Sequence, residues 1–483
     1  MTLLALHLDR TNDTPLYLQI YDQLKMAILA GEIGPGMRLP SSRQLAQAHG
    51  VGRITVTQAY EQLEREGYVY GRTGAGTYVS DDLSVAEKGA ENAPFVPALS
   101  TWGERVMAVG KDGRSASGSR PAIDFGFGRS FPHIFPYDIW RRLLARYLST
   151  DDVMLSRYGS VAGFYPLRQA LADYLRRLRG VRCTADQVVI VSGVQQALDI
   201  LARLLLMEGD GVLVETPGYV DAFALFRLHG CHLLALPVGD CGFPVAQIPA
   251  DCEARLAYVT PSNQFPRGGA LPLKEQLALL QWARQHEALI VEDDYDGELR
   301  YEGRPLAAMQ GLDTDGRVVY LGTFSKVLFP ALRLSYVVLP ESLVTAFVRA
   351  KGLVDRGAPT LTQAAVADFI TEGHFERHLK HLRQAYGRRR QVLIKALENY
   401  LPGKVQYVAA PAGLHVMLYL PPGADEAQLV RDAAQAGVGV YPGRPYHVQV
   451  DAPPSILLGF SGLAEPEIEE GIRRLAAVME TTD

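Results

Sequence analysis

The sequence predicts a multidomain fold in which a small α+β module precedes a large α/β domain. The chain has 483 residues, about three times the length of an average domain. Residues 15–80 contain three helical patterns and a hairpin pattern. From residue 121 onward, apolar strand-like runs alternate with amphipathic helical stretches. That alternation is typical of a mostly parallel sheet with helices on both faces.

The composition is that of an ordinary globular protein and excludes disordered and fibrous classes. Hydrophobic residues make up 48% of the chain, charged residues 21%, and the formal net charge is -5. No run of about 18 apolar residues occurs, and residues 1–13 lack the apolar core of a signal peptide. The cysteines lack the close spacing of metal or redox motifs: Cys183, Cys231, Cys241 and Cys252. We therefore expect a soluble, cytoplasmic protein with reduced thiols.

The amino-terminal module reads as three helices and a hairpin. The first helical pattern lies in PLYLQIYDQLKMAILAG and is stopped by Gly31. The second begins after Ser41, a good N-cap residue, and ends at Gly50. The third, ITVTQAYEQLEREG, begins near Arg53 and ends at Gly67. The alternating segment YVYGRTGAGTYVS predicts a hairpin around a glycine-rich turn from Gly71 to Gly76.

The second and third helices, with a hairpin behind them, form the pattern of a winged helix-turn-helix. Residues 1–80 contain seven Lys or Arg and seven Asp or Glu, so overall charge does not indicate DNA binding. Side-chain position does, because a helix in the major groove presents its first turns to base edges. The residues there are Arg53, Thr55, Thr57 and Gln58, and Ser42 and Arg43 are placed for phosphates. The alternative is a small interaction domain with solvated arginines.

The string GEIGPGMRLPSSRQLAQAHGVGRITVTQAYEQLEREGYVYGRTGAGTYV resembles the winged helix of the GntR family of bacterial regulators over nearly the whole module. The resemblance implies a DNA-binding domain over residues 1–80. It places Gly76 at the wing tip that approaches the minor groove. The residues that it implies contact operator DNA are Arg43, Arg53, Thr55 and Thr57.

A connector is expected between the two domains. Residues 81–120 are rich in Asp, Glu, Lys, Ser, Gly and Ala, which is typical of a flexible linker. Within it, Leu99–Val109, with Trp102 and Val106, predicts a short helix that docks on a neighbouring domain.

The large domain is expected over residues 121–483. Its strand-like runs are QVVIV, GVLVE, RLAYV, ALIVE, RVVYLG and LSYVVL. From about Glu341 the chain has long helices and then shorter strands around Leu414–Leu420 and Ile456–Phe460, which predicts a smaller α+β lobe.

Polar residues follow five of these strand-like runs. In a parallel sheet, the carboxyl ends of the strands gather at one edge, where ligands bind. Those residues include Ser192, Gly193, Val194, Gln195, Tyr219, Thr260, Asn263, Gln264, Asp293, Tyr295, Thr323, Ser325, Lys326 and Arg333. The first three open a helix, whose free amides are suited to a phosphate.

A lysine between polar residues at the end of a buried strand is typical of a Schiff-base lysine. Lys326 has this position. Pyridoxal 5'-phosphate needs a helix amino terminus and an arginine for its phosphate, a carboxylate for its ring nitrogen, an aromatic side chain to stack and donors for its ring oxygen. The strand-end residues supply each of these groups, so the sequence predicts a site for this cofactor.

Residues 120–483 resemble fold-type I aminotransferases through SGVQQAL, PGY, DDYDGEL and TFSK followed by Arg333. The resemblance implies that Lys326 forms the Schiff base, Asp293 pairs with the pyridine nitrogen and Tyr219 stacks on the ring. Asn263 and Tyr295 would reach the ring oxygen. The residues implied to hold the phosphate are Ser192, Gly193, Val194, Thr323, Ser325 and Arg333.

A winged helix joined to an aminotransferase-like domain resembles the MocR/GabR subfamily of GntR regulators over essentially the whole chain. In that subfamily the large domain senses ligands. The segment from Tyr158 to Gly163 resembles the one whose tyrosine reaches the phosphate of the neighbouring subunit. The resemblance therefore implies a head-to-tail, domain-swapped homodimer in which Tyr158 completes the partner's site.

The sequence departs from working aminotransferases at the substrate carboxylate. The arginine that usually grips it is replaced by Leu457 in SILLGFSGL. Arg444, in YPGRPYH, is a candidate substitute, and a solvated arginine is the alternative. The loop TPSNQFPRG is one residue longer than its counterpart, which leaves Asn263 and Gln264 both open for the ring-oxygen contact.

Three functions fit these observations. The first is a transcriptional regulator that binds operator DNA and responds to an amino compound. The second is an active aminotransferase with an accessory DNA-binding module. The third is a sensor of pyridoxal phosphate itself. We favour a regulator over a metabolic enzyme, with a residual transamination half-reaction left open because Lys326 and Asp293 are both present.

Overall fold

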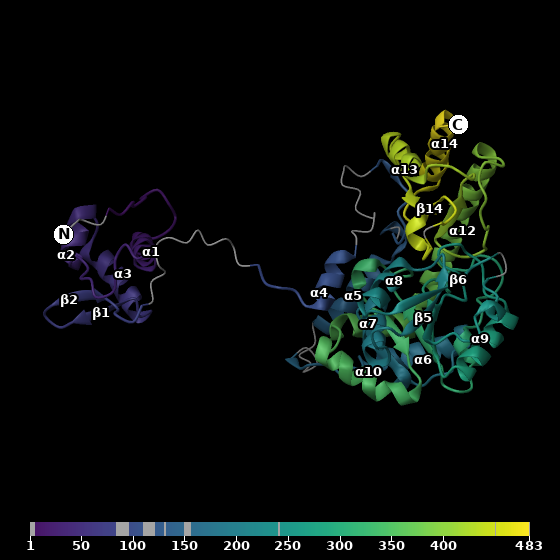
Figure 1. Ribbon diagram of the computed structural model, residues 1–483, viewed down its shortest axis with the longest axis horizontal. Coiled ribbons are helices and arrows are strands. Elements are labelled where there is room, and N and C mark those ends of the chain that lie inside the picture. Colours follow the sequence, from purple (N-terminus) through teal and green to yellow (C-terminus); the bar gives the residue numbers. More distant parts are fainter. Residues whose placement is uncertain are drawn as a thin grey trace. The chain divides into compact units, whose positions relative to one another are not determined.

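The structure, a computed structural model, describes residues 5–83, 96–109, 121–129, 132–148, 156–239, 242–449 and 451–482. The chain divides into two compact units, residues 1–98 and 99–483 (Figure 1). Most of the expected linker lies outside the described residues, and so does Cys241 in the large unit. Each unit is therefore considered by itself.

The small unit contains three helices and an antiparallel hairpin (Figure 1). They are α1 (Leu16–Leu29), α2 (Ser42–His49), α3 (Arg53–Arg65), β1 (Val69–Arg72) and β2 (Gly76–Val79). This arrangement confirms the predicted helices and hairpin.

Local sequence signals set the ends of α2. The Ser41 side chain accepts a hydrogen bond from the Gln44 backbone, and the Gln44 side chain bonds back to the Ser41 backbone. The helix ends at Gly50, whose φ of 63° is a left-handed conformation that glycine adopts without strain. Leu24, Leu45 and Leu63, each fully buried, hold α1, α2 and α3 around one core.

The large unit is built on a seven-stranded sheet in the order β4-β10-β9-β8-β7-β5-β6. The strands are β4 (Val188–Val191), β5 (Gly211–Thr216), β6 (His232–Pro237), β7 (Ala254–Val259), β8 (Leu289–Asp294), β9 (Val318–Thr323) and β10 (Ser335–Val338). The mostly parallel sheet is confirmed, with β10 antiparallel to both neighbours. The edge strand β6 is an addition to the six predicted runs.

Helices cover both faces of this sheet. One face packs against α7 (Val194–Leu205), α8 (Val220–Leu228) and α10 (Glu341–Val354). On the other face are α6 (Tyr165–Arg179), α9 (Leu273–Gln285), α11 (Thr360–Thr371) and α12 (His374–Tyr400). A further helix, α5 (Tyr137–Leu148), packs on α11. The result is the predicted three-layer α/β architecture.

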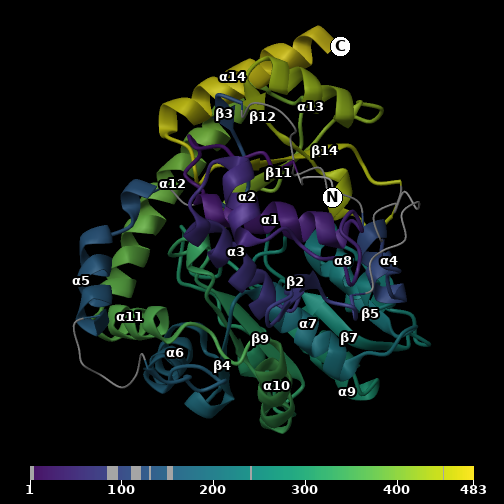
Figure 2. The ribbon, with the colours of Figure 1, turned by 90° about the vertical axis from the view of Figure 1, so that its left-hand side faces the viewer.

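The chain ends in the predicted α+β lobe. Its three-stranded antiparallel sheet has the order β11-β14-β13, with β11 (His415–Tyr419), β13 (Tyr441–Pro442) and β14 (Ser455–Gly459). A second pair joins β12 (Val438–Gly439) to β3 (Ile123–Asp124). Two helices, α13 (Glu426–Gln435) and α14 (Glu465–Thr482), lie together beside β14 (Figure 2).

The short helix expected within the connector is present as α4 (Thr101–Ala108). It begins after Ser100, whose side chain accepts a hydrogen bond from the Gly103 backbone. It docks on the large unit through an ion pair between Arg105 and Glu208. Among the helices that the structure describes, none is long and apolar enough to cross a membrane.

Candidate functional site

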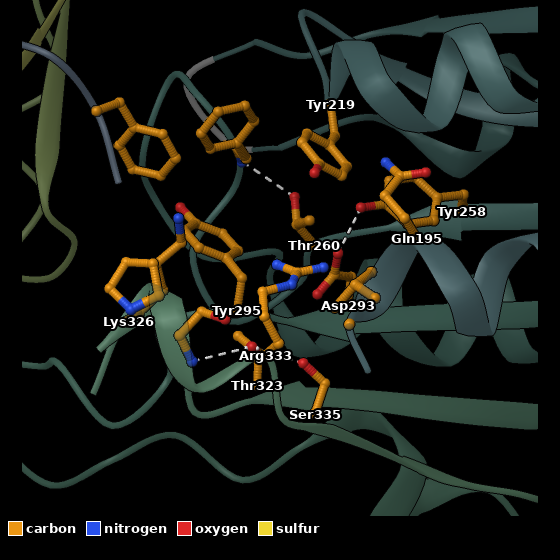
Figure 3. A pocket seen from close by; sticks show the side chains of 16 residues that line it. Gln195, Tyr219, Tyr258, Thr260, Asp293, Tyr295, Thr323, Lys326, Arg333 and Ser335 are labelled. Carbon is orange, nitrogen blue, oxygen red and sulfur yellow. Dashed lines mark hydrogen bonds between the residues drawn. The ribbon is translucent and has the colours of Figure 1, made fainter. Parts of the chain in front are cut away.

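A cavity opens at the carboxyl edge of the seven-stranded sheet (Figure 3). Its lining comes from strand ends, from the loops that follow them and from one segment before α5. The lining residues are Phe127, Gly193, Val194, Gln195, Tyr219, Tyr258, Thr260, Phe265, Asp293, Tyr295, Thr323, Ser325, Lys326, Pro330, Arg333 and Ser335. Nine of the predicted cofactor residues are in this set. Residues that follow the carboxyl ends of neighbouring strands therefore lie together, as the sequence predicts.

Lys326 follows β9 and extends into the cavity beside an aromatic ring. Its Nζ lies 4.3 Å from the centre of the Phe127 ring. A Cβ at Gly128 would lie 3.0 Å from the same nitrogen, so the backbone there approaches it closely. Thr323 holds the start of the loop, because its Oγ1 accepts hydrogen bonds from the Ser325 backbone (3.1 Å) and the Ser335 hydroxyl (2.8 Å).

Asp293, at the end of β8, is the carboxylate of the cavity. Its Oδ2 accepts a hydrogen bond of 2.6 Å from the Tyr258 hydroxyl (Figure 3). Its Oδ1 is buried and has no partner among the described residues. Burial raises the pKa of Asp293 to about 6, while the Tyr258 hydrogen bond and the Lys326 charge oppose that rise.

Arg333 and the amino terminus of α7 lie together at the other end of the cavity. A Cβ at Gly193, the N-cap residue just before α7, would come within 2.7 Å of the Arg333 guanidinium. Glycine is therefore required for this close approach. A helix amino terminus beside a guanidinium is a suitable site for a phosphate group.

The structure brings Asn263, and not Gln264, to Tyr295. The Asn263 side-chain amide donates to the Tyr295 hydroxyl (3.0 Å) and to Asp296 (2.9 Å). The Gln264 amide donates instead to the backbone carbonyls of Pro217 and Phe265, both at 2.7 Å. Gln264 therefore shapes its loop, while Asn263 orients the Tyr295 ring.

A second buried carboxylate positions the loop after β7. Glu215 accepts hydrogen bonds from the Thr260 backbone (3.0 Å) and hydroxyl (2.6 Å). Burial raises the pKa of Glu215 to about 7, and the Thr260 hydrogen bonds oppose that rise. The Thr260 hydroxyl also accepts from the Phe265 backbone (3.0 Å), which fixes the aromatic ring at the cavity wall.

Besides Asn263, three predicted site residues lie outside the cavity lining, and so does Leu457, which stands where the usual arginine was expected. Ser192 precedes Gly193, and its backbone donates to Gln196. Tyr158 is 85% exposed, with Arg356 6.0 Å from its ring centre. Arg444 is exposed, and its backbone donates to Glu426. Leu457, on β14, is buried in an apolar cluster with Phe265 and Tyr295.

Sequence reasoning missed the roles of Tyr258, Phe127 and Gly128. A signal existed for Tyr258, because the hydroxyl of a tyrosine in a buried strand needs a hydrogen-bond partner. Nothing in the sequence linked residues 127 and 128 to Lys326, almost 200 positions away.

The predicted DNA-contacting residues lie on α2, on α3 and in the hairpin, and the starts of the two helices are in contact. Arg53 begins α3, and its Nε donates to the Ser42 hydroxyl (3.3 Å) at the start of α2. Arg43 is exposed on α2. Gly76 begins β2 after the hairpin turn, and a Cβ there would lie 2.8 Å from the Arg38 Nε. Ile54, which the sequence reasoning passed over, is 76% exposed beside Arg53.

The cavity residues fit pyridoxal phosphate on the structure alone. The unpartnered Asp293 Oδ1 is an acceptor for a ring N–H, and Lys326 supplies an amine. The close approach of Gly193 and Arg333 forms an anion site, and the Tyr219 side chain lines the cavity between these groups.

Comparison with known proteins gives the same division of the chain. Residues 16–79 match the family described as "Bacterial regulatory proteins, gntR family", and residues 134–475 match "Aminotransferase class I and II". The probable rhizopine catabolism regulatory protein MocR of Rhizobium meliloti is 38% identical over 97% of this chain and 94% of its own length. The chain belongs to the MocR/GabR subfamily of GntR-type regulators.

Two further similarities are to a regulator and to an aminotransferase of known structure. The pyridoxine biosynthesis regulator PdxR of Corynebacterium glutamicum is 29% identical over 86% of this chain and 85% of its own length. The solved structure of kynurenine aminotransferase from Pyrococcus horikoshii is 30% identical, with a TM-score of 0.71 over 75% of this chain and 92% of that one. The MocR/GabR architecture thus combines a regulator's DNA-binding domain with an aminotransferase fold.

Proposed function

We propose that this protein is a cytoplasmic, dimeric transcriptional regulator whose large unit carries pyridoxal phosphate on Lys326 and senses a small amino compound there. Both functional parts occur in one chain: the GntR domain for operator DNA and the aminotransferase-like cavity for the cofactor. The domain assignment is residues 1–80 for DNA binding, 81–120 for the linker and 121–483 for the effector unit.

The cavity residues divide the work of holding the cofactor. Pyridoxal phosphate supplies an aldehyde that reacts reversibly with amines. Asp293 accepts the ring N–H at its unpartnered Oδ1, and Tyr258 keeps that carboxylate oriented and ionised. Tyr219 and Tyr295 contact the ring and its oxygen. Gly193 and Arg333 enclose the phosphate, with Ser192, Val194, Thr323 and Ser325 around it.

The observation that carries the regulatory proposal is the contact of Lys326 with the segment Phe127–Gly128. That segment follows the connector by only a few residues, and Ile123–Asp124 within the same stretch pairs with the carboxyl-terminal lobe. Any movement of the Lys326 side chain on ligand binding would change its packing against Phe127 and Gly128. This contact therefore links the ligand to the point where the connector enters the large unit.

The test uses the full chain and an operator found by mapping the DNA that it occupies beside its own coding region. We expect the effector to change the footprint or affinity of the parent and to leave Lys326→Ala unchanged. Gly128→Ala, which adds a methyl group 3.0 Å from Lys326 at a φ of 83°, should alter the response. Gly423→Ala is the matched control, because its φ is 89° and nothing lies within 4 Å of the added carbon. An equal response in Lys326→Ala and the parent would refute the proposal.

The proposed dimer is head-to-tail and domain-swapped, with Tyr158 reaching the phosphate of the other subunit. Support comes from an exposed group of large side chains: Tyr158 (85%), Leu353 (91%) and Val354 (51%). Sedimentation of the holoprotein should give a dimer. Tyr158→Phe should weaken cofactor retention, although Tyr158 does not line the cavity of its own subunit. A monomer that retains the cofactor equally in both forms would contradict the dimeric site.

A second candidate function is catalysis of transamination, which the intact pair of Lys326 and Asp293 favours. A metabolic enzyme turns over at about 10 per second. We expect far slower turnover with common α-amino acids and keto acids, because Leu457 supplies no charge for their carboxylates. Turnover near the enzyme median would make catalysis the primary function.

A further inference from the structure

One wall of the cavity is apolar and aromatic. It is formed by a buried cluster that shares Phe265 and Tyr295 with the cavity lining. The other buried members of this cluster are Val220, Met417, Tyr446 and Leu457, and Phe127 and Tyr219 pack against it. The Phe265 ring is central to the wall, with ring centres 5.1 Å from Phe127, 5.5 Å from Tyr295 and 5.5 Å from Tyr446.

Strand register in the small carboxyl-terminal sheet produces this wall. Leu457 of β14 pairs with Met417 of β11 on one side and with Tyr441 of β13 on the other. Residues directly opposite each other on neighbouring antiparallel strands have side chains on the same face. Met417 and Leu457 are 0% and 1% exposed, so this face is a packed apolar surface.

The next residue on this face of β11 adds no charge at neutral pH. His415 lies two residues before Met417, its ring centre is 4.8 Å from Phe127 and its Nε2 pairs with the Pro266 carbonyl (3.0 Å). Burial and, to a lesser extent, the nearby Lys326 charge lower the pKa of His415 to about 3, while the hydrogen bond to the Pro266 carbonyl opposes this change. The imidazole is therefore neutral and continues the aromatic wall.

The positive charges around the cavity already have partners. Among the described lining residues they belong to Lys326 and Arg333, which serve the cofactor's aldehyde and phosphate. Outside the lining, Arg129 forms an ion pair with the buried Asp124, which also accepts from the Tyr441 hydroxyl (2.8 Å). Arg267 lies over the Tyr419 ring, 5.4 Å from its centre. An ionised carboxylate beside the reacting amine would therefore be buried against apolar groups, which is costly.

We propose that the effector is a primary amine with an apolar or aromatic carbon body and no carboxylate beside the amine. Phe127 and Phe265 line the wall that selects it, and Met417 and Leu457 pack in the apolar cluster behind that wall. This inference rests on the proposed function, because it names the chemistry of the compound sensed at Lys326. Apolar burial supplies the affinity. The described lining residues offer no cation besides Lys326 and Arg333, which disfavours the α-carboxylate of an amino acid.

The first test uses the parent holoprotein and three matched probes: 2-phenylethylamine, L-phenylalanine and L-phenylalaninamide. The readout is the change in the cofactor's absorption spectrum during titration. We expect the amine and the neutral amide to reach half-saturation at concentrations about tenfold or more below that of the amino acid. The amide controls for bulk, because it differs from the amino acid in charge and hardly in size. Equal or tighter binding of L-phenylalanine would overturn the proposal.

The second test places a charge in the wall. Leu457→Arg should narrow or reverse the preference between the amine and the amino acid, while Leu277→Arg, at a 49% exposed position on α9, should leave it as in the parent. Cofactor absorption and the thermal unfolding midpoint show whether the Leu457→Arg protein is folded. If it is not, the three-probe series on the parent still decides.

The two proposals fail in different ways. If the spectral preference for the amine holds and no amine alters DNA binding, the regulatory proposal is wrong and the apolar subsite stands. If an α-amino acid both binds more tightly and alters DNA binding, the regulator stands and the apolar-amine proposal is wrong.

Discussion

The hydrogen bond from Tyr258 to Asp293 gives a sharp test of the cofactor site. Tyr258→Phe removes one oxygen atom from a side chain that is 2% exposed and leaves its ring in place. The lost bond is 2.6 Å long and is donated to a buried carboxylate. Hydrogen bonds to charged groups contribute about 1.5 to 3 kcal/mol. We therefore expect the affinity for pyridoxal phosphate to fall by roughly 10- to 150-fold.

The chain contains a matched control for this change. Tyr320 is buried on the neighbouring strand, and its hydroxyl donates to Asp294 at the same distance of 2.6 Å. Asp294 forms a buried ion pair with Arg179, whose Nε is 2.9 Å from the carboxylate oxygen, and it does not line the cavity. Tyr320→Phe should therefore lower stability by a similar amount and leave cofactor affinity as in the parent.

The pH dependence of binding gives the same test a second readout. The pKa of Asp293 is about 6, and its ionised form accepts the ring N–H, so the parent's affinity should fall as the pH drops through 6. Loss of the Tyr258 hydrogen bond raises this pKa, so the midpoint should move to higher pH in Tyr258→Phe. Absorbance titrations of both variants between pH 5 and 8 measure affinity and midpoint. Parent-like values in Tyr258→Phe, or equal shifts in the two variants, would refute the assigned role of Asp293.

Three further predictions concern other parts of the molecule. Lys326→Ala should lose the cofactor's lysine-dependent absorption band. An unchanged band would show that Lys326 is not the residue that binds the cofactor's aldehyde. Folding raises the pKa of Asp293 from 3.8 to about 6, so the ionised carboxylate destabilises the folded protein above pH 6. Asp293→Asn removes this carboxylate and should raise the unfolding free energy of the cofactor-free protein by about 3 kcal/mol at pH 8. Chemical denaturation at pH 8 and pH 4 measures this gain, which should vanish at the lower pH. Ile54, which is 76% exposed at the start of α3, should contact the methyl group of an operator thymine. Replacing operator thymines one at a time by deoxyuridine, which lacks this methyl group, should weaken binding of the parent protein at one position. The same replacement should not change the binding of Ile54→Ala.

The sequence was informative where function depends on neighbours in the chain. Thr323, Ser325 and Lys326 follow one strand directly, so their meeting at the sheet edge followed from the parallel topology. Residues brought in by distant segments were not predictable in this way. Phe127 and Gly128 follow β3, which pairs with β12 over two residues on each side, and the Phe125 carbonyl also accepts from the Gly459 backbone. Such short pairings leave no pattern in the sequence.

Arg444 and β6 show two other limits. Arg444 was a reasonable effector contact by its position in the loop, yet the structure has it exposed while Tyr446, two residues later, packs on Phe265 at 5.5 Å. Both residues belong to the 3-10 turn Arg444–Tyr446, whose tight winding points them in different directions. The edge strand β6 escaped prediction because its residues, HLLALP, are mostly half-buried and show no clear alternation.

The charges in the cavity favour ligand sensing over repeated transamination. A full transamination requires the site to accept two carboxylates in succession, one on the amino acid and one on the keto acid. The described cavity offers two cations, and both have a cofactor group to serve. An apolar amine needs neither, since each 100 Å² of its surface buried against lining residues such as Phe127 and Phe265 contributes about 2.5 kcal/mol. A ligand shifts a conformational equilibrium only through its different affinity for the two states. We therefore expect the amine to act through the Lys326 side chain, whose Nζ lies 4.3 Å from the centre of the Phe127 ring.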